Sequence, residues 1–199
     1  MTRTLPHLGR SRRGVVVAAV LLCVAGCQPR PSNLATTVES CRGSCRESRR
    51  ELLRELDRSR TDWERLKSTH GSCYRYHDEF TSWAGFGQRT EVVVCDDAPV
   101  SREMTAWNAQ RETVKHWQEP QEGPLGSHAD TTAGAEVLEK LFARCRAMVE
   151  ETDLDAYRFT LTFHANGILK HCLRSHRGCA DDCDEGIRVL GLTFIGEGE

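Results

Sequence analysis

Residues 157–174 read YRFTLTFHANGILKHCLR, and this stretch decides the predicted fold. Residues 157–164 alternate in polarity, Asn166-Gly167 favours a tight turn, and residues 168–174 form the returning strand of a β-hairpin. Because side chains alternate across a strand, the pairing assigns each residue to a face. One face carries Phe159, Leu161, Phe163, Ile168 and Cys172. The other face carries Thr160, Thr162, His164, Leu169 and His171.

Elements on both sides of the hairpin complete a small domain. Apolar residues at helical spacing predict a helix over residues 135–151, with Cys145 on its apolar side. A second helix is expected from about Ala180 to Leu190, followed by a last strand at residues 192–195. The predicted fold class is therefore α+β, with an α-β-β-α-β domain over residues 135–199.

From about residue 136 to residue 195, the chain resembles the C-terminal domain of TonB and related envelope proteins, in a cysteine-bearing form. The residues that carry the resemblance are Cys145, Phe163, Gly167-Ile168, Cys183, Leu192 and Phe194. The resemblance implies that the two helix cysteines pair, Cys145 with Cys183, which leaves Cys172 to pair with Cys179. Energy transduction is not expected, because the transmembrane anchor and long Pro-rich spacer of TonB have no counterpart in this sequence.

Histidines and cysteines are dense in residues 171–183, HCLRSHRGCADDC. His171 and Cys172 are adjacent in a strand, so they point to opposite faces and cannot bind one ion. A set of Cys172, His176, Cys179 and Cys183 avoids this conflict, but its spacings are not those of common zinc modules. Disulfides are the preferred interpretation, and no metal site is predicted. The alternative is a thiol redox or metal-binding module built on the Cys172–Cys183 cluster.

The N-terminal half is predicted to be a helical, cysteine-containing module over residues 34–117, stapled by disulfides. Apolar residues at spacings of three, four or seven mark one stripe of a long helix: Leu34, Val38, Cys41, Cys45, Leu52, Leu56, Trp63 and Leu66. Glu91 to Cys95 reads as a short strand, and Ser101 caps a second helix that runs to about Trp117. Residues 118–134 are interrupted by proline and glycine, so we expect a linker or long surface loop.

Residues 1–26 have the arrangement of a secretory signal peptide. Four arginines and no acidic residue precede an uncharged run of 13 residues, which is shorter than the roughly 20 residues a transmembrane helix needs. The sequence VAGC at residues 24–27 resembles the lipobox of bacterial lipoproteins. This resemblance implies cleavage between Gly26 and Cys27 and lipidation of Cys27. Gln28 favours the outer membrane in that family, and residues 27–33 would form a lipidated tether.

Loss of the leader changes the charge and the cysteine count. The mature chain would carry 23 basic and 29 acidic residues, a formal charge of −6, which gives no electrostatic reason to bind nucleic acid. Eight cysteines remain besides Cys27, in two clusters of four: Cys41, Cys45, Cys73 and Cys95, then Cys145, Cys172, Cys179 and Cys183. In an oxidising compartment all eight are predicted to form disulfides, although the count alone leaves the connectivity open.

The sequence predicts a cellular location more clearly than a biochemical activity. It contains no Gly-x-Ser-x-Gly, His-Glu-x-x-His, P-loop or haem-attachment pattern, so no catalytic residue, enzymatic activity or cofactor is predicted. The expected protein is a cell-envelope lipoprotein, held by Cys27 in the outer membrane on its periplasmic or surface side. We expect it to bind or scaffold an envelope protein.

Overall fold

The computed structural model describes residues 35–38, 45–129 and 131–196, and these form an α+β fold with antiparallel sheets. The predicted fold class is confirmed at this level. The helices are α1 (Cys45–His70) and α2 (Leu138–Glu151). The strands are β1 (Ala35–Val38), β2 (Tyr74–Thr81), β3 (Gly87–Cys95), β4 (Ala98–Trp107), β5 (Thr113–Glu119), β6 (Tyr157–Phe163), β7 (Leu169–His176), β8 (Glu185–Arg188) and β9 (Leu190–Phe194).

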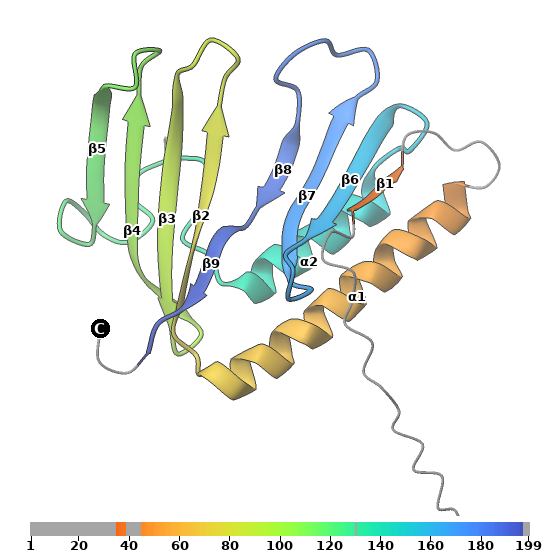
Figure 1. The fold of residues 1–199 in the computed structure, drawn as a ribbon, viewed down its shortest axis with the longest axis horizontal. Coiled ribbons are helices and arrows are strands. Elements are labelled where there is room, and N and C mark those ends of the chain that lie inside the picture. Colours follow the sequence, from red (N-terminus) through yellow and green to blue (C-terminus); the bar gives the residue numbers. More distant parts are fainter. Residues whose placement is uncertain (1–34, 39–44, 130, 197–199) are drawn as a thin grey trace, which may run out of the picture.

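The strands form two sheets that are joined by one continuous segment of chain. One sheet has the order β5-β4-β3-β2-β9, and the other has the order β1-β6-β7-β8. Only Val189 separates β8 from β9, so the chain leaves the second sheet and enters the first without a loop. Figure 1 shows the result as a row of strands from β5 to β1, with both helices running across it.

Both helices pack into a single hydrophobic core. The buried stripe of α1 contains Leu52, Leu56 and Trp63, which recur at spacings of four and seven residues. The Trp63 ring lies edge-on to Tyr74 of β2 at 4.8 Å and stacks on Phe194 of β9 at 5.6 Å. Burial of each such side chain stabilises the fold by roughly 1.5–3 kcal/mol. The core cluster includes residues from both halves of the sequence.

The start of α2 is attached to β2 by two tyrosines. The Tyr74 hydroxyl accepts a hydrogen bond from the Leu138 amide at 2.9 Å, and the Tyr76 hydroxyl donates to the Glu136 carbonyl at 2.8 Å.

In the described part of the chain, no helix is both long and apolar enough to cross a membrane.

The hairpin predicted at residues 157–174 is confirmed as β6 and β7. Its predicted core face is buried, and Leu161 pairs with Cys172 in the ladder. Leu169 is the exception. The prediction placed it on the face opposite the core, but in the structure its side chain is buried. The register shifts after Thr162, which pairs with His171, so that Phe163 pairs with Leu169. This bulge turns Leu169 towards the core.

Two predicted helices are wrong, and the start of a third is misplaced. The segment from Ser101 to Trp117 forms β4 and β5, because Arg102 and Met104 alternate inward and Asn108 makes a turn between the strands. The segment from Ala180 to Leu190 leads into β8, where Ile187 and Val189 alternate inward. The predicted first helix begins at Cys45 rather than at residue 34, and residues 35–38 pair with β6 as β1. In each case strand pairing outweighs the local helical pattern.

The segment expected to be a linker or surface loop, residues 118–134, begins within β5 and is held against the sheet. Arg102 of β4 and Glu119 of β5 are 2% and 0% exposed, and they form two hydrogen bonds of 3.1 and 3.0 Å. The guanidinium also donates to the carbonyls of His128 and Ala133. The loop amides of Gly126 and His128 donate to the Glu119 carboxylate.

The electrostatic balance of this pair favours the charged form of Glu119. Burial alone would raise the pKa of the Glu119 carboxyl, but the hydrogen bonds from Arg102, His128 and Gly126 hold it well below its usual range. The His128 ring stacks on Trp117 at 4.3 Å and adds an apolar contact. The pair therefore acts as a structural anchor for the loop.

Candidate binding cleft

The structure joins cysteines into disulfides, and three pairs lie within the described residues: Cys73–Cys95, Cys145–Cys172 and Cys179–Cys183. Cys45 is also disulfide-bonded. The predicted lipidation and cleavage residues, Cys27 and Gly26, lie outside the described residues, as does Cys41.

The pairing implied by the TonB resemblance is a wrong prediction. Cys145 bonds Cys172 rather than Cys183, with the two Cα atoms 5.9 Å apart and both residues fully buried. Cys145 lies on the buried stripe of α2, and Cys172 lies on the core face of β7 directly beneath it. Cys183 precedes β8 in a surface loop, so the helix that would have brought it to Cys145 does not exist.

The histidines and cysteines of residues 171–183 do not converge. Cys172 faces the core, whereas the Nδ1 atom of His171 lies 2.9 Å from the Thr162 hydroxyl on the other face. Desolvation by burial lowers the pKa of His171 to about 4, with neighbouring cations adding to the effect. Within the described residues, no group of three or more potential ligands could hold a metal ion.

A cleft opens where the row of strands divides. β9 pairs with β2 only as far as His77, and β8 pairs with β7, so residues 78–81 of β2 face β8 with no ladder between them. Figure 1 shows β2 and β8 diverging towards the end where the β2–β3 and β7–β8 turns lie. The cleft here has a volume of about 360 Å³. Its lining is Glu79, Phe80, Thr81, Arg158, Ser175, Arg188 and the loop residues 179–184.

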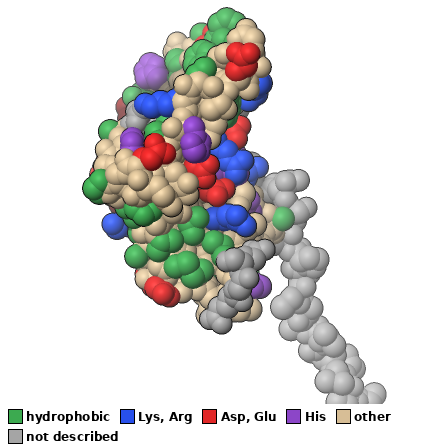
Figure 2. All heavy atoms as spheres, turned by 90° about the vertical axis from the view of Figure 1, so that its left-hand side faces the viewer, with side chains coloured by type: hydrophobic (Ala, Val, Ile, Leu, Met, Phe, Trp, Pro, Cys, Tyr) green, Lys and Arg blue, Asp and Glu red, His purple; other side chains and the backbone are tan. Residues whose placement is uncertain are grey.

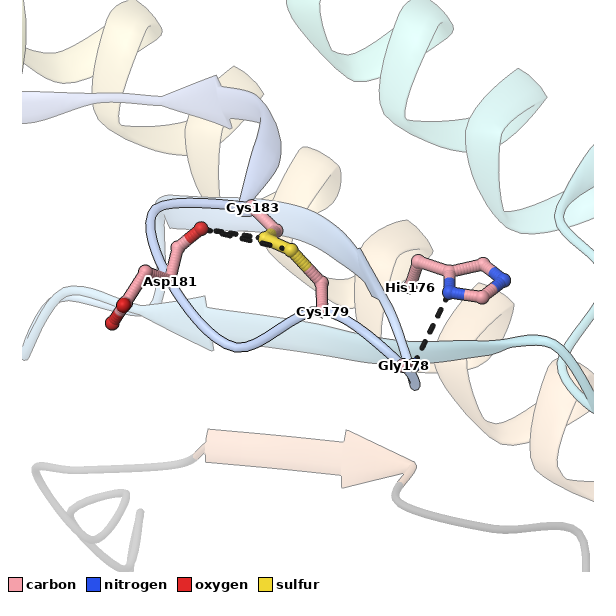
Figure 3. Close-up of a disulfide and its surroundings, with 5 residues drawn as sticks. All are labelled: His176, Gly178, Cys179, Asp181 and Cys183. Atoms are coloured by element: carbon pink, nitrogen blue, oxygen red, sulfur yellow. Dashed lines mark hydrogen bonds between the residues drawn. A yellow bond between two sulfur atoms is a disulfide. The ribbon is translucent and has the colours of Figure 1, made fainter.

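The disulfide loop between β7 and β8 forms one wall of this cleft. The disulfide closes the loop between Cys179 and Cys183, and the carbonyl oxygen of Asp181 lies 3.6 Å from the Cys179 sulfur (Figure 3). At the start of the loop, the Gly178 amide donates to the His176 ring at 3.2 Å. The Ser82 hydroxyl donates to the Asp182 carboxylate at 3.1 Å, which connects the loop to the opposite wall. The disulfide and these hydrogen bonds hold this wall of the cleft in place.

The cleft carries an excess of negative charge. Four carboxylates line it, from Glu79, Asp181, Asp182 and Asp184, against the guanidinium groups of Arg158 and Arg188. Sequence reasoning missed this site, because residues 180–190 were interpreted as a helix and residues 79–81 lie 100 positions away. The run CADDCDE was the one available signal.

Two aromatic side chains stand beside the cleft, in the turn between β2 and β3. Trp83 is 82% exposed and Phe86 is 49% exposed. The Phe86 ring lies 6.4 Å from the ring of Phe80, which lines the cleft. Figure 2 shows hydrophobic side chains at the end of the molecule where this turn lies.

A buried carboxyl lies near the cleft, on the helix side of β2. Asp78 is 5% exposed, and its Oδ1 atom has no hydrogen-bond partner among the described residues. Desolvation raises the pKa of Asp78 to about 7, against the opposing effect of Arg188, the Glu79 amide and Arg144. The carboxyl borders a cavity of about 20 Å³, which is room for one water molecule.

No protein-family model matches this chain, and searches of curated proteins and of solved structures find no significant match.

Proposed function

We propose that this chain is a lipid-anchored envelope protein and a non-enzymatic binding domain, whose cleft between β2 and β8 receives a basic segment of a partner protein. The observation that carries the proposal is the cleft itself, where four carboxylates face two guanidinium groups in about 360 Å³. Complementary charge across an interface steers association and selects the partner. A lysine or arginine of the partner would lie against Asp181 and Asp184.

The anchor is proposed from the sequence. The VAGC stretch at residues 24–27 would make Cys27 the lipidated N-terminus of a mature outer-membrane lipoprotein. More than one acyl chain is needed for stable anchoring, and the lipoprotein modification supplies this. The disulfides support the proposal, because such bonds persist in the oxidising envelope.

A binding role fits the cleft better than thiol exchange does. Reactive cysteines have their thiolates stabilised by nearby positive charge. At Cys179 and Cys183 the loop instead places three aspartates within five residues, and these carboxylates disfavour a thiolate. The cysteine pair is therefore proposed to shape the cleft wall.

The test is site-directed photocrosslinking in cells that produce the full chain. A photoreactive phenylalanine analogue at Thr81, in the cleft, is expected to yield one adduct of defined mass. The same analogue at Val114, on the outer strand β5, serves as the position control and is expected to yield no such adduct.

Charge reversal then examines the chemistry of the contact. Asp181→Lys and Asp184→Lys should each reduce the Thr81 adduct about tenfold or more, because like charges repel the basic segment. Glu150→Lys on α2 makes the same charge change away from the cleft and should leave the yield unchanged. Adducts that are equal at both positions, or that ignore the charge of the cleft, contradict the proposed function.

A further inference from the structure

The turn between β2 and β3 differs in chemistry from the rest of the surface. The turn residues 82–86, SWAGF, and the first two residues of β3, Gly87 and Gln88, contain no charged residue, although 28% of the chain is charged. Trp83 is the most exposed large hydrophobic residue among those described, and Phe86 is half exposed beside it. Large aromatic side chains at this exposure mark a surface that contacts an apolar phase or a partner.

Two backbone hydrogen bonds hold the turn in a defined conformation. The Ser82 amide donates to the Phe86 carbonyl and the Gly85 amide donates to the Ser82 carbonyl, both at 2.9 Å. Gly85 has a φ of +90°, which other residues adopt only with strain. A Cβ atom at Gly87 would lie 2.7 Å from the Trp107 ring, so glycine allows that ring to support the turn. Insertion would therefore cost little ordering entropy.

We propose that this turn is a membrane-contact element, and that Trp83 and Phe86 insert into the headgroup region of a lipid surface with neutral, zwitterionic headgroups. Tryptophan concentrates at membrane interfaces because its ring is amphipathic. The turn carries no ionised side chain of its own that would have to be desolvated on entering this region. The inference goes beyond the proposed function and does not require the cleft to bind anything.

Charge on the neighbouring loop selects the kind of lipid. Ser82, at the base of the turn, is hydrogen-bonded to Asp182, so the carboxylates of Asp181 and Asp184 would approach the same surface. Anionic headgroups would repel these carboxylates, whereas zwitterionic headgroups would not. A polybasic surface, which is the usual sign of binding to anionic lipid, is missing from the described residues of this turn and loop.

The experiment uses the full lipidated chain, reconstituted into phosphatidylcholine vesicles with or without bromine on the acyl chains. Bromine quenches nearby indole fluorescence, and the difference between the wild type and Trp83→Phe isolates the emission of Trp83. We expect bromine to remove about half or more of that emission, since interfacial aromatics lie at the boundary between headgroups and acyl chains. Phe86→Ser should reduce the quenching.

The control reporter is Val100→Trp in the Trp83→Phe background. Val100 is 46% exposed on β4, near the β3–β4 turn at the opposite end of the sheet, so an indole there is accessible to water but lies away from the β2–β3 turn. We expect no quenching at this position. Equal quenching of the two indoles, or none at Trp83, would overturn the proposal.

Changes in lipid composition and in the cleft distinguish insertion into neutral lipid from binding to anionic lipid and from contact with a protein. Replacing a third of the phosphatidylcholine by phosphatidylglycerol should weaken Trp83 quenching at low salt and not at high salt, and an increase would overturn the assignment to neutral lipid. Burial of Trp83 only after addition of a partner protein would show a protein contact instead and overturn the proposal. Asp181→Lys, which tests the cleft, should not abolish quenching in phosphatidylcholine, so the two proposals can fail separately.

Discussion

Asp78→Asn should stabilise the protein at alkaline pH and have almost no effect at acidic pH. The carboxyl of Asp78 is buried, and within the part of the chain that the structure describes its Oδ1 atom lacks a hydrogen-bond partner. Burial raises its pKa to about 7, whereas an aspartate in the unfolded chain titrates near 3.9. The charged and polar groups that face the carboxyl come from several elements: Arg188 of β8, Arg144 of α2, Glu136 and Thr132 of the preceding loop, and Tyr76 of β2.

The magnitude follows from the difference between the two pKa values. Below pH 4 the carboxyl is protonated in both states and contributes no pH dependence. Between pH 4 and pH 7 the unfolded chain releases the proton and the folded chain retains it, so the free energy of unfolding falls as the pH rises. At 1.36 kcal/mol for each pH unit, the loss reaches about 4 kcal/mol and then levels off. An uncharged amide avoids this loss, and after its own desolvation we expect a gain of about 2–4 kcal/mol at pH 8.5.

The assay is equilibrium unfolding in urea with the disulfides intact, for the wild type and Asp78→Asn at pH 4, 6, 7 and 8.5. The difference in the free energy of unfolding should be near zero at pH 4 and grow to its limit above pH 7. Glu79→Gln is the matched control, because the neighbouring side chain lies on the other face of β2, and it should show no such growth. A difference that is independent of pH, or an Asn variant that is less stable at pH 8.5, would refute the reasoning.

The other predictions concern the anchor, the disulfides and the buried ion pair. Cys27→Ser should carry no lipid and leave the membrane fraction, as measured by fatty-acid labelling. Thiol titration should show that the disulfides of the other cysteines are kept. Loss of those disulfides would contradict the separate role assigned to Cys27. Removing Cys145–Cys172 by a double change to alanine should cost about 3.5 kcal/mol, because its loop spans 27 residues, whereas removing Cys179–Cys183, with a separation of 4, should cost about 2 kcal/mol. Urea unfolding measures both, and the opposite order would contradict this account. Arg102→Leu leaves the buried Glu119 carboxylate without its cation and should cost about 3–5 kcal/mol. The pKa of Glu119 is held low in the folded state, so the stability from this pair is present above about pH 4 and is lost as the pH falls. Arg102→Leu should therefore remove this fall in the free energy of unfolding at acidic pH.

The hairpin was predictable because its signals are local and agree with one another. Alternation over residues 157–164 and the turn signal at Asn166-Gly167 predict both strands and most of their register, while the structure starts β7 at Leu169 and adds a bulge there. The stripe through Leu52, Leu56 and Trp63 likewise marked α1 correctly. A local helical pattern predicted the right element only where no strand from another part of the sequence pairs with the segment.

The helix predicted from Ser101 failed because its pattern is ambiguous. Ser101 follows Pro99 as a helix cap would, but residues 101–107 pair with β3, and residues 113–117 fold back to pair with β4. Its one local turn signal was Asn108, whose side-chain oxygen accepts hydrogen bonds from the amides of Gln110 and Glu112. The acidic run at residues 181–185 was a signal for one wall of the cleft, but the cleft itself was not predictable, because the tertiary fold joins residues 79–81 to residues 179–184.

The continuity of β8 and β9 has a consequence for the order in which the chain can fold. β2 ends at Thr81 and β9 begins only at Leu190, yet Tyr74 of β2 pairs with Phe194 of β9. The sheet that contains β2 therefore keeps an uncovered strand edge until β9 pairs with it, and contacts between distant residues form slowly. Complete folding of either half must wait for the same short C-terminal segment. Truncation before Leu190 would therefore leave β2 unpaired along that edge and expose Trp63 where Phe194 now covers it.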